Sequence, residues 1–97
     1  MIDIEITAVY EKWYKKLRDA RAQDVINVRL RRIKEGNFGD FKSLGDGLYE
    51  IRIHYSAGYR LYFVNKGERW ILILCGGAKS TQEKDIKLAR KLAKEVK

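Results

Sequence analysis

Hydrophobic and polar residues alternate over residues 2–6 with the two-residue period of a half-buried strand. Thr7 then suits the N-cap of a helix, because from Tyr10 onward the hydrophobic residues recur at the spacing of one helical face. Asp19 suits the cap of a second helix that ends at Gly36, a residue type that tolerates a left-handed terminus. The start of the chain is therefore predicted to form one strand followed by a helical hairpin.

The pattern changes to the period of strands after this hairpin. Strands separated by glycine-containing turns are predicted over residues 38–44, 48–55, 59–64 and 69–75. Ser80 and Glu83 have the spacing of a capping box, which predicts a last helix. The chain has no proline and no repeat, so we expect a single domain over residues 1–97. Its predicted class is α+β, with the helices on one face of an antiparallel sheet.

Composition excludes several classes of protein. With 45% hydrophobic and 35% charged residues, the chain can fill a small core and is unlike a disordered segment. No hydrophobic run approaches the roughly 20 residues that cross a bilayer, and the first residues are acidic where a signal peptide is basic. We therefore expect a soluble cytoplasmic protein that does not span a membrane. One cysteine, Cys75, and one histidine, His54, are too few for a structural zinc site, so no metal and no cofactor is expected.

The net charge favours an anionic partner. Twenty-one Lys and Arg residues against thirteen Asp and Glu residues give +8. Such an excess favours nucleic acid, an anionic membrane surface or an acidic protein. Arg29, Arg32 and Lys84, which lie on the predicted helices, are candidates to bind RNA, although basic residues on helices most often form a solvated face.

Candidate chemistry lies on the two middle strands and just after the last one. If the hydrophobic residues of each strand pack on the helices, the residues between them must point to the other side of the sheet. The open face is then predicted to gather Glu50, Arg52, His54, Arg60, Tyr62 and Lys79. Cations beside an imidazole, a phenol and a carboxylate can bind a phosphate and place an acid or base within reach of it.

This set of residues could cleave RNA without a metal, because the 2′-hydroxyl of RNA is itself a nucleophile. Arg52, Arg60 and Lys79 would neutralise the charge of the phosphate. His54, Glu50 or Tyr62 would transfer protons. One histidine cannot be both base and acid, so a second proton carrier of another type is required. The plain alternatives are that Glu50 and Arg52 form only a surface ion pair and that His54 is an ordinary surface residue.

Three blocks of sequence resemble the RelE/HigB branch of the RelE/ParE toxin superfamily. They are Gly47 to Ile53, Gly58 to Phe63, and Leu74 to Gln82 followed by Asp85 and Ile86. Within that branch the chain is similar to the "addiction module killer protein" subgroup of type II toxin-antitoxin systems. The resemblance implies a RelE-like fold, ribosome-dependent cleavage of messenger RNA and a cognate antitoxin, commonly of the helix-turn-helix type.

The resemblance also implies roles for individual residues. Arg60 matches the family's phosphate-binding arginine, Arg52 matches a basic strand residue, and Lys79 stands where relatives have a basic residue after the last strand. His54 falls where several relatives carry another basic residue. Glu50 departs from the pattern, because RelE is basic there, and the C-terminal catalytic tyrosine of RelE has no match in this chain. The general base is therefore left open between Glu50 and His54.

The resulting hypothesis is a metal-independent endoribonuclease toxin that cleaves ribosome-bound messenger RNA by attack of the 2′-hydroxyl. Its expected partners are an antitoxin, the ribosome and messenger RNA. One alternative is a ParE-like inhibitor of DNA gyrase, which would use the same fold without the set of basic residues. Another is a module that only binds its antitoxin.

Overall fold

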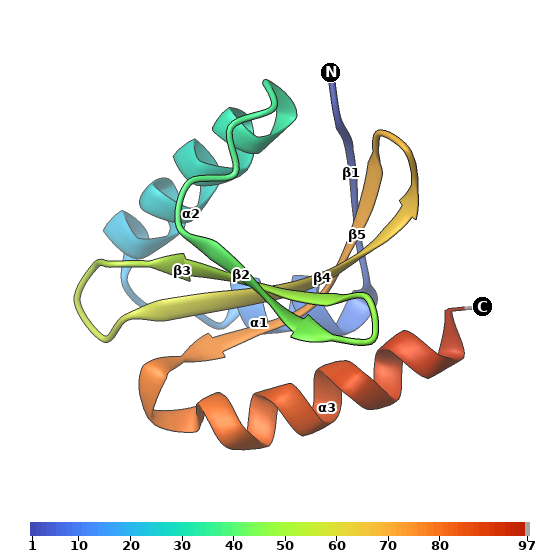
Figure 1. The fold of residues 1–97 in the computed structure, drawn as a ribbon. Helices are drawn as coiled ribbons and strands as arrows, with labels where there is room; N and C mark the ends of the chain where they lie inside the picture. Colours follow the sequence, from blue (N-terminus) through green and yellow to red (C-terminus); the bar gives the residue numbers. More distant parts are fainter. Residues whose placement is uncertain (97) are drawn as a thin grey trace.

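The computed structural model describes residues 1–96, which form one five-stranded sheet and three α-helices (Figure 1). In chain order the elements are β1 (Asp3–Ile6), α1 (Ala8–Lys15), α2 (Ala20–Lys34), β2 (Phe41–Gly45), β3 (Leu48–Ile53), β4 (Tyr59–Gly67), β5 (Trp70–Ala78), a short 3₁₀ helix η1 (Lys79–Thr81) and α3 (Gln82–Glu95). Among these residues no helix is both long enough and apolar enough to cross a membrane.

The sheet is mixed rather than wholly antiparallel. Its strand order is β1-β5-β4-β3-β2, and β1 pairs with β5 in parallel while the other neighbours are antiparallel. The expected antiparallel sheet is therefore wrong at β1, because a two-residue period reveals which residues share a face and not the direction of the neighbouring strand. Strands β4 and β5 also run three residues beyond their predicted ends, to Gly67 and Ala78.

Side-chain caps fix the first two helices as the sequence predicts. Thr7 Oγ1 accepts a hydrogen bond from the Tyr10 backbone nitrogen at 3.0 Å, and Asp19 Oδ1 accepts from the second and third residues of α2. The predicted capping box of Ser80 and Glu83 is wrong. The chain forms η1 there, α3 begins at Gln82, and no side chain caps α3.

Helices cover both faces of the sheet, so the prediction that they share one face is wrong. The α1 and α2 side contains Ile51, Ile53, Leu61 and Phe63 from the strands, and the α3 side contains Leu48, Tyr62, Leu72, Leu74 and Cys75. Figure 1 shows α2 and α3 on opposite sides of the strands. The reason lies in β5, a nearly continuous apolar strand whose successive side chains need cover on both faces.

Two glycines of β5 let α1 and α3 approach the strand closely. A Cβ atom on Gly76 would lie 2.5 Å from the Trp13 ring, and one on Gly77 would lie 1.8 Å from the Asp85 carboxylate. These residues therefore belong to the strand and not to a turn after it. Glycine within a strand marks such a close approach.

We expect Gly77→Ala to lower the free energy of unfolding by roughly 1–3 kcal/mol, because the added methyl group displaces the buried Asp85 carboxylate. Gly67→Ala in β4 is the matched control, since its Cβ would make only ordinary contacts, 3.7 Å or more, with Trp70. Urea denaturation measures both variants. Equal stability of the two would contradict this account of the strand.

Candidate functional site

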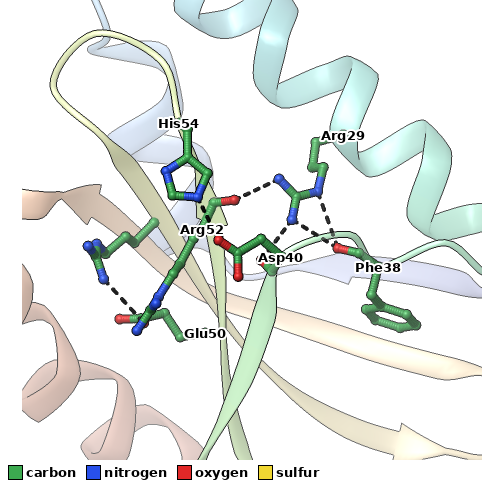
Figure 2. A network of polar contacts seen from close by, with 7 residues as sticks. Arg29, Phe38, Asp40, Glu50, Arg52 and His54 are labelled. Carbon is green, nitrogen blue, oxygen red and sulfur yellow. Dashed lines mark hydrogen bonds and ion pairs between the residues drawn. The ribbon is translucent and has the colours of Figure 1, made fainter.

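The centre of the candidate site is Glu50, a carboxylate with 0% exposure that lies between the sheet and α3. Its Oε1 accepts hydrogen bonds from Arg52 Nε at 3.1 Å and Arg60 Nη1 at 3.3 Å. Its Oε2 accepts one from Gln82 Nε2 of α3 at 2.7 Å. The register explains this convergence, because Arg52 of β3 pairs directly with Arg60 of β4 and both share the face of Glu50. Figure 2 shows Glu50 with Arg52 beside it.

Glu50 stays ionised at neutral pH. Burial alone raises the pKa of this carboxyl, but hydrogen bonds from Gln82 and Arg52, with the charge of Arg60, lower the pKa below its ordinary value. The expectation that Glu50 lies on an open face is wrong, since α3 covers it. A buried carboxylate with both oxygens bonded is suited to hold the two arginines rather than to move a proton.

The two arginines keep donors free for an anion. The side chains of Arg52 and Arg60 are 31% and 12% exposed. Of the N–H groups of these two guanidiniums, only Nε of Arg52 and Nη1 of Arg60 donate to an acceptor within residues 1–96, and both donate to Glu50. The remaining N–H groups of each guanidinium have no protein acceptor there. A planar fork of this kind matches two oxygens of a phosphate.

Tyr62 is fully buried beneath α3, in the cluster that contains Leu48 and Leu74. Burial and the charge of Glu50 raise the pKa of the Tyr62 phenol above its ordinary value. The expectation that Tyr62 contacts RNA is therefore wrong for this structure, because its ring is not at the surface. The sequence correctly predicted which face of the sheet Tyr62 lies on. It did not predict that α3 covers this face.

His54 lies just beyond the end of β3 and is hydrogen-bonded through Nε2 to the Asp40 carboxylate (Figure 2). Their side chains are 74% and 47% exposed. The hydrogen bond from His54 is the main cause that lowers the pKa of Asp40, and the charges of His54, Arg52 and Arg29 act in the same direction. The structure therefore places an imidazole and a carboxylate beside the strand that carries Arg52.

Arg29 of α2 binds the backbone and not the solvent. Its guanidinium donates to the carbonyl oxygens of Phe38 at 3.0 and 3.2 Å, Asp40 at 2.8 Å and Arg52 at 2.6 Å (Figure 2). Burial lowers the pKa of Arg29, and the charge of Asp40 opposes this change. The expectation that Arg29 is free to bind RNA is wrong, because its donors are used to fasten α2 to the segment before β2 and to the end of β3.

The other predicted basic residues are exposed but do not form one surface. Lys79 begins η1 after β5, close to Gly58, at the end of the sheet where Arg60 pairs with Gly77. Arg32 lies on α2 and Lys84 on α3, which cover opposite faces. Lys84 lines a shallow hollow with Ser80, Thr81, Glu83 and Lys87. Roles for Arg32 and Lys84 in RNA binding stay predictions.

Sequence reasoning missed three polar residues at this site. Gln82 lies in a quoted sequence block but was given no role, although it supplies the α3 contact to Glu50. Asp40 and Lys42 fall on the same face as Arg52 and Glu50, since the Arg52 nitrogen donates to the Asp40 carbonyl and Lys42 pairs with Glu50. Only the register of β2 against β3 could have found them, and it is not readable from the residues alone.

Among residues 1–96, no three side chains of His, Cys, Asp or Glu lie close enough together to hold a metal ion. Cys75 is buried, and burial raises the pKa of its thiol to about 12. Its Sγ lies 3.7 Å from the Asp85 carbonyl oxygen.

A profile of the family described as "Phage derived protein Gp49-like" matches residues 12–94. The chain belongs to this family. A relative by sequence is an uncharacterized protein of Haemophilus influenzae strain Rd, which is 47% identical over 95 residues, 98% of this chain and 96% of the relative. This match gives the relationship without giving an activity.

Two solved structures share the fold of this Gp49-like chain. The crystal structure of the intact E. coli RelBE toxin-antitoxin complex contains a chain with a TM-score of 0.67 and 20% identity, over 80% of this chain and 96% of that one. The isolated E. coli RelE toxin has a TM-score of 0.67 and 18% identity, over 90% of this chain and 97% of RelE. The predicted RelE-like fold is confirmed. Membership of the "addiction module killer protein" subgroup stays a prediction.

We expect the buried Glu50 of this Gp49-like chain to make its stability sensitive to acid. A carboxyl group whose pKa is lower in the folded state than in the unfolded state stabilises the folded protein. This stabilisation is complete at pH values above the ordinary pKa of 4.5, and it is lost as the pH falls through the lower pKa of the folded state. Glu50→Gln should cost roughly 3 kcal/mol at pH 7, because Arg52 and Arg60 lose their anion, and should flatten the dependence of unfolding free energy on pH below about 5. Glu68→Gln, at an exposed turn, is the control. An unchanged acid profile in Glu50→Gln would contradict the assignment.

Arg29→Ala should lower the free energy of unfolding by roughly 2–4 kcal/mol, because three carbonyl groups lose a charged donor. Arg32→Ala removes an exposed arginine from the same helix and should change it by no more than about 0.5 kcal/mol. Chemical denaturation of both variants tests the difference. Similar losses in the two would show that Arg29 has no special structural role.

Proposed function

We propose that this Gp49-like chain is the toxin of a toxin-antitoxin pair and a metal-independent endoribonuclease that cleaves ribosome-bound messenger RNA. One observation carries the proposal: Arg52 and Arg60 are fixed on the buried Glu50 while their remaining N–H groups stay free. The fold shared with the E. coli RelE toxin supports the same conclusion. The match to the RelBE complex supports an antitoxin partner.

Substrate binding begins with the two guanidinium groups. A phosphodiester carries its charge on two non-bridging oxygens, and two forks on adjacent strands can bind them at the same time. Because Glu50 already holds both side chains in place, little rotamer entropy remains to be lost when RNA binds. The donors face charge that grows on the phosphate as the 2′-oxygen attacks, so they stabilise the transition state more than the bound substrate.

Proton transfer is assigned to the exposed residues around this pair. His54 takes the proton of the 2′-hydroxyl, the bond from O2′ to phosphorus forms, and the bond from phosphorus to O5′ breaks. Lys79, which lies at the same end of the sheet, donates a proton to the departing 5′-oxygen and regains one from water. The products are a 2′,3′-cyclic phosphate and a 5′-hydroxyl end. Glu50 holds the arginines and takes no part in proton transfer.

The proposed partners follow from charge and from the fold. A net charge of +8 favours association with the ribosome and its RNA in the cytoplasm, and makes that association weaken steeply with salt. The proposed cognate antitoxin is of the helix-turn-helix type. It would neutralise the toxin by covering the arginine pair.

Arg60→Ala and Arg52→Ala should each reduce cleavage of a ribosome-bound message by about 100-fold or more, because each removes a donor to the developing charge. Arg69→Ala is the matched control, since Arg69 is exposed in the turn just before β5, at the end of the sheet away from Arg60. Mapping of RNA 5′ ends in a purified translation system measures cleavage, and circular dichroism verifies that each variant is folded.

Two results would overturn the proposal. One is wild-type cleavage by a folded Arg60→Ala variant at equal concentration. The other is intact message with the wild-type chain while DNA breaks accumulate in cells that express it, which would favour a gyrase inhibitor instead. Harmless expression together with intact message would leave only a module that binds its antitoxin.

A further inference from the structure

Asp40 contacts both His54 and Arg52, two residues to which the proposed function gives roles. Its Oδ2 is hydrogen-bonded to His54 Nε2. The backbone carbonyl of Asp40 accepts a hydrogen bond from the backbone nitrogen of Arg52 at 2.9 Å. The charge of the Arg52 side chain also acts on this carboxyl. Asp40 therefore links the imidazole to β3, the strand that carries Arg52.

The main chain at Asp40 is held more firmly than an exposed segment usually is. Arg29 donates to the carbonyl oxygens on both sides of Gly39, those of Phe38 and Asp40. Gly39 has φ +65°, and a Cβ there would lie 2.7 Å from the Arg29 side chain. The guanidinium therefore packs against a backbone conformation that favours glycine. These four residues, Arg29, Phe38, Gly39 and Asp40, form a clamp that fixes the main chain from which the Asp40 side chain extends. Figure 2 shows Arg29 with the Phe38 and Asp40 ends of this clamp.

We propose that Asp40 is a positioning residue that orients the His54 ring for general-base catalysis. The carboxylate accepts the Nε2–H, so the neutral ring carries its free lone pair on Nδ1, which is the atom that takes the proton of the 2′-hydroxyl. The proton leaves O2′ for Nδ1, and Nε2 keeps its own proton throughout. This inference rests on the proposed function and adds a residue to it.

The exposure of the pair separates this role from a structural one. Both side chains are substantially exposed, and exposed ion pairs contribute little to folding stability. The charged groups that face Asp40 are His54 beyond β3, Arg52 of β3 and Arg29 of α2. Of these three side chains, only the imidazole of His54 has a ring nitrogen with a lone pair that can accept a proton from substrate, since a guanidinium group has no acceptor. Loss of the carboxylate should therefore change turnover far more than stability.

The test compares Asp40→Asn and Asp40→Glu with Asp24→Asn, an exposed aspartate of α2 that serves as the matched control. Asp40→Asn should lower kcat for cleavage of ribosome-bound message by roughly 10- to 100-fold with KM within twofold. Asp40→Glu should recover a large part of that loss, and Asp24→Asn should behave as wild type. The midpoint of urea unfolding should stay unchanged in all three. Equal kcat in Asp40→Asn and wild type would overturn the inference.

Two further readouts report on the ring itself. His54 is the only histidine of the chain, so its ¹⁵N signals are unambiguous. With the ring neutral, wild type should carry the proton on Nε2, and Asp40→Asn should lose that preference. Asp40→Asn should also add little to the defect of His54→Gln, because the two residues act as one unit. Additive defects, or a ring protonated on Nδ1 in wild type, would overturn the inference.

The outcome for this inference can be told apart from that of the proposed function. Cleavage that is lost in Arg60→Ala and retained in Asp40→Asn overturns only the role of Asp40. A wild-type chain that cleaves no message overturns the proposed function, and the role of Asp40 with it.

Discussion

The arrangement of the candidate site depends on one buried carboxylate. Glu50 has no exposure to water, and an ionised group in such a place requires partners that replace its hydration. It finds them on three elements: Arg52 on its own strand, Arg60 on the next strand and Gln82 at the start of α3. The same contacts that keep the carboxylate in the core also hold both guanidinium groups near one end of the two inner strands β3 and β4. The stability of the core and the orientation of the two arginines therefore depend on the same hydrogen bonds.

Much of the fold could be predicted because local signals fix it. Thr7 and Asp19 cap the helices that their positions indicate, and the alternation in β3 and β4 correctly assigns Ile51 and Leu61 to the side of the helical hairpin. The two-residue period of a strand does not indicate which layer of the structure covers each face of the sheet. The residues opposite Ile51 and Leu61 were expected to be open to solvent. The amphipathic α3 instead covers Glu50 and Tyr62, and Tyr62 becomes part of a second core, while the side chains of Arg52 and His54 keep part of their surface exposed.

The candidate site could be predicted only in part, for a related reason. Placing Arg52 beside Arg60 requires only that the two strands form a hairpin, which the turn between them makes evident. The partners from other elements depend on long-range geometry. Gln82 is 32 residues from Glu50, and Asp40 is 14 residues from His54. The positions of the charged residues did not indicate their roles either. The sequence does not distinguish an arginine that faces solvent from one, such as Arg29, that binds backbone carbonyl groups.

The junction between β5 and α3 explains why Gln82 reaches Glu50 at all. Asp85, in the first turn of α3, is buried and accepts a hydrogen bond from the Thr81 hydroxyl. Its carboxylate occupies the space that a side chain at Gly77 would need, and Gly77 pairs with Arg60. The first turn of α3 therefore packs on β5 at Gly77, directly beside Arg60. Since both the helix start and the arginine are fixed at this point, the docking of α3 and the geometry of the arginine pair form one structural unit.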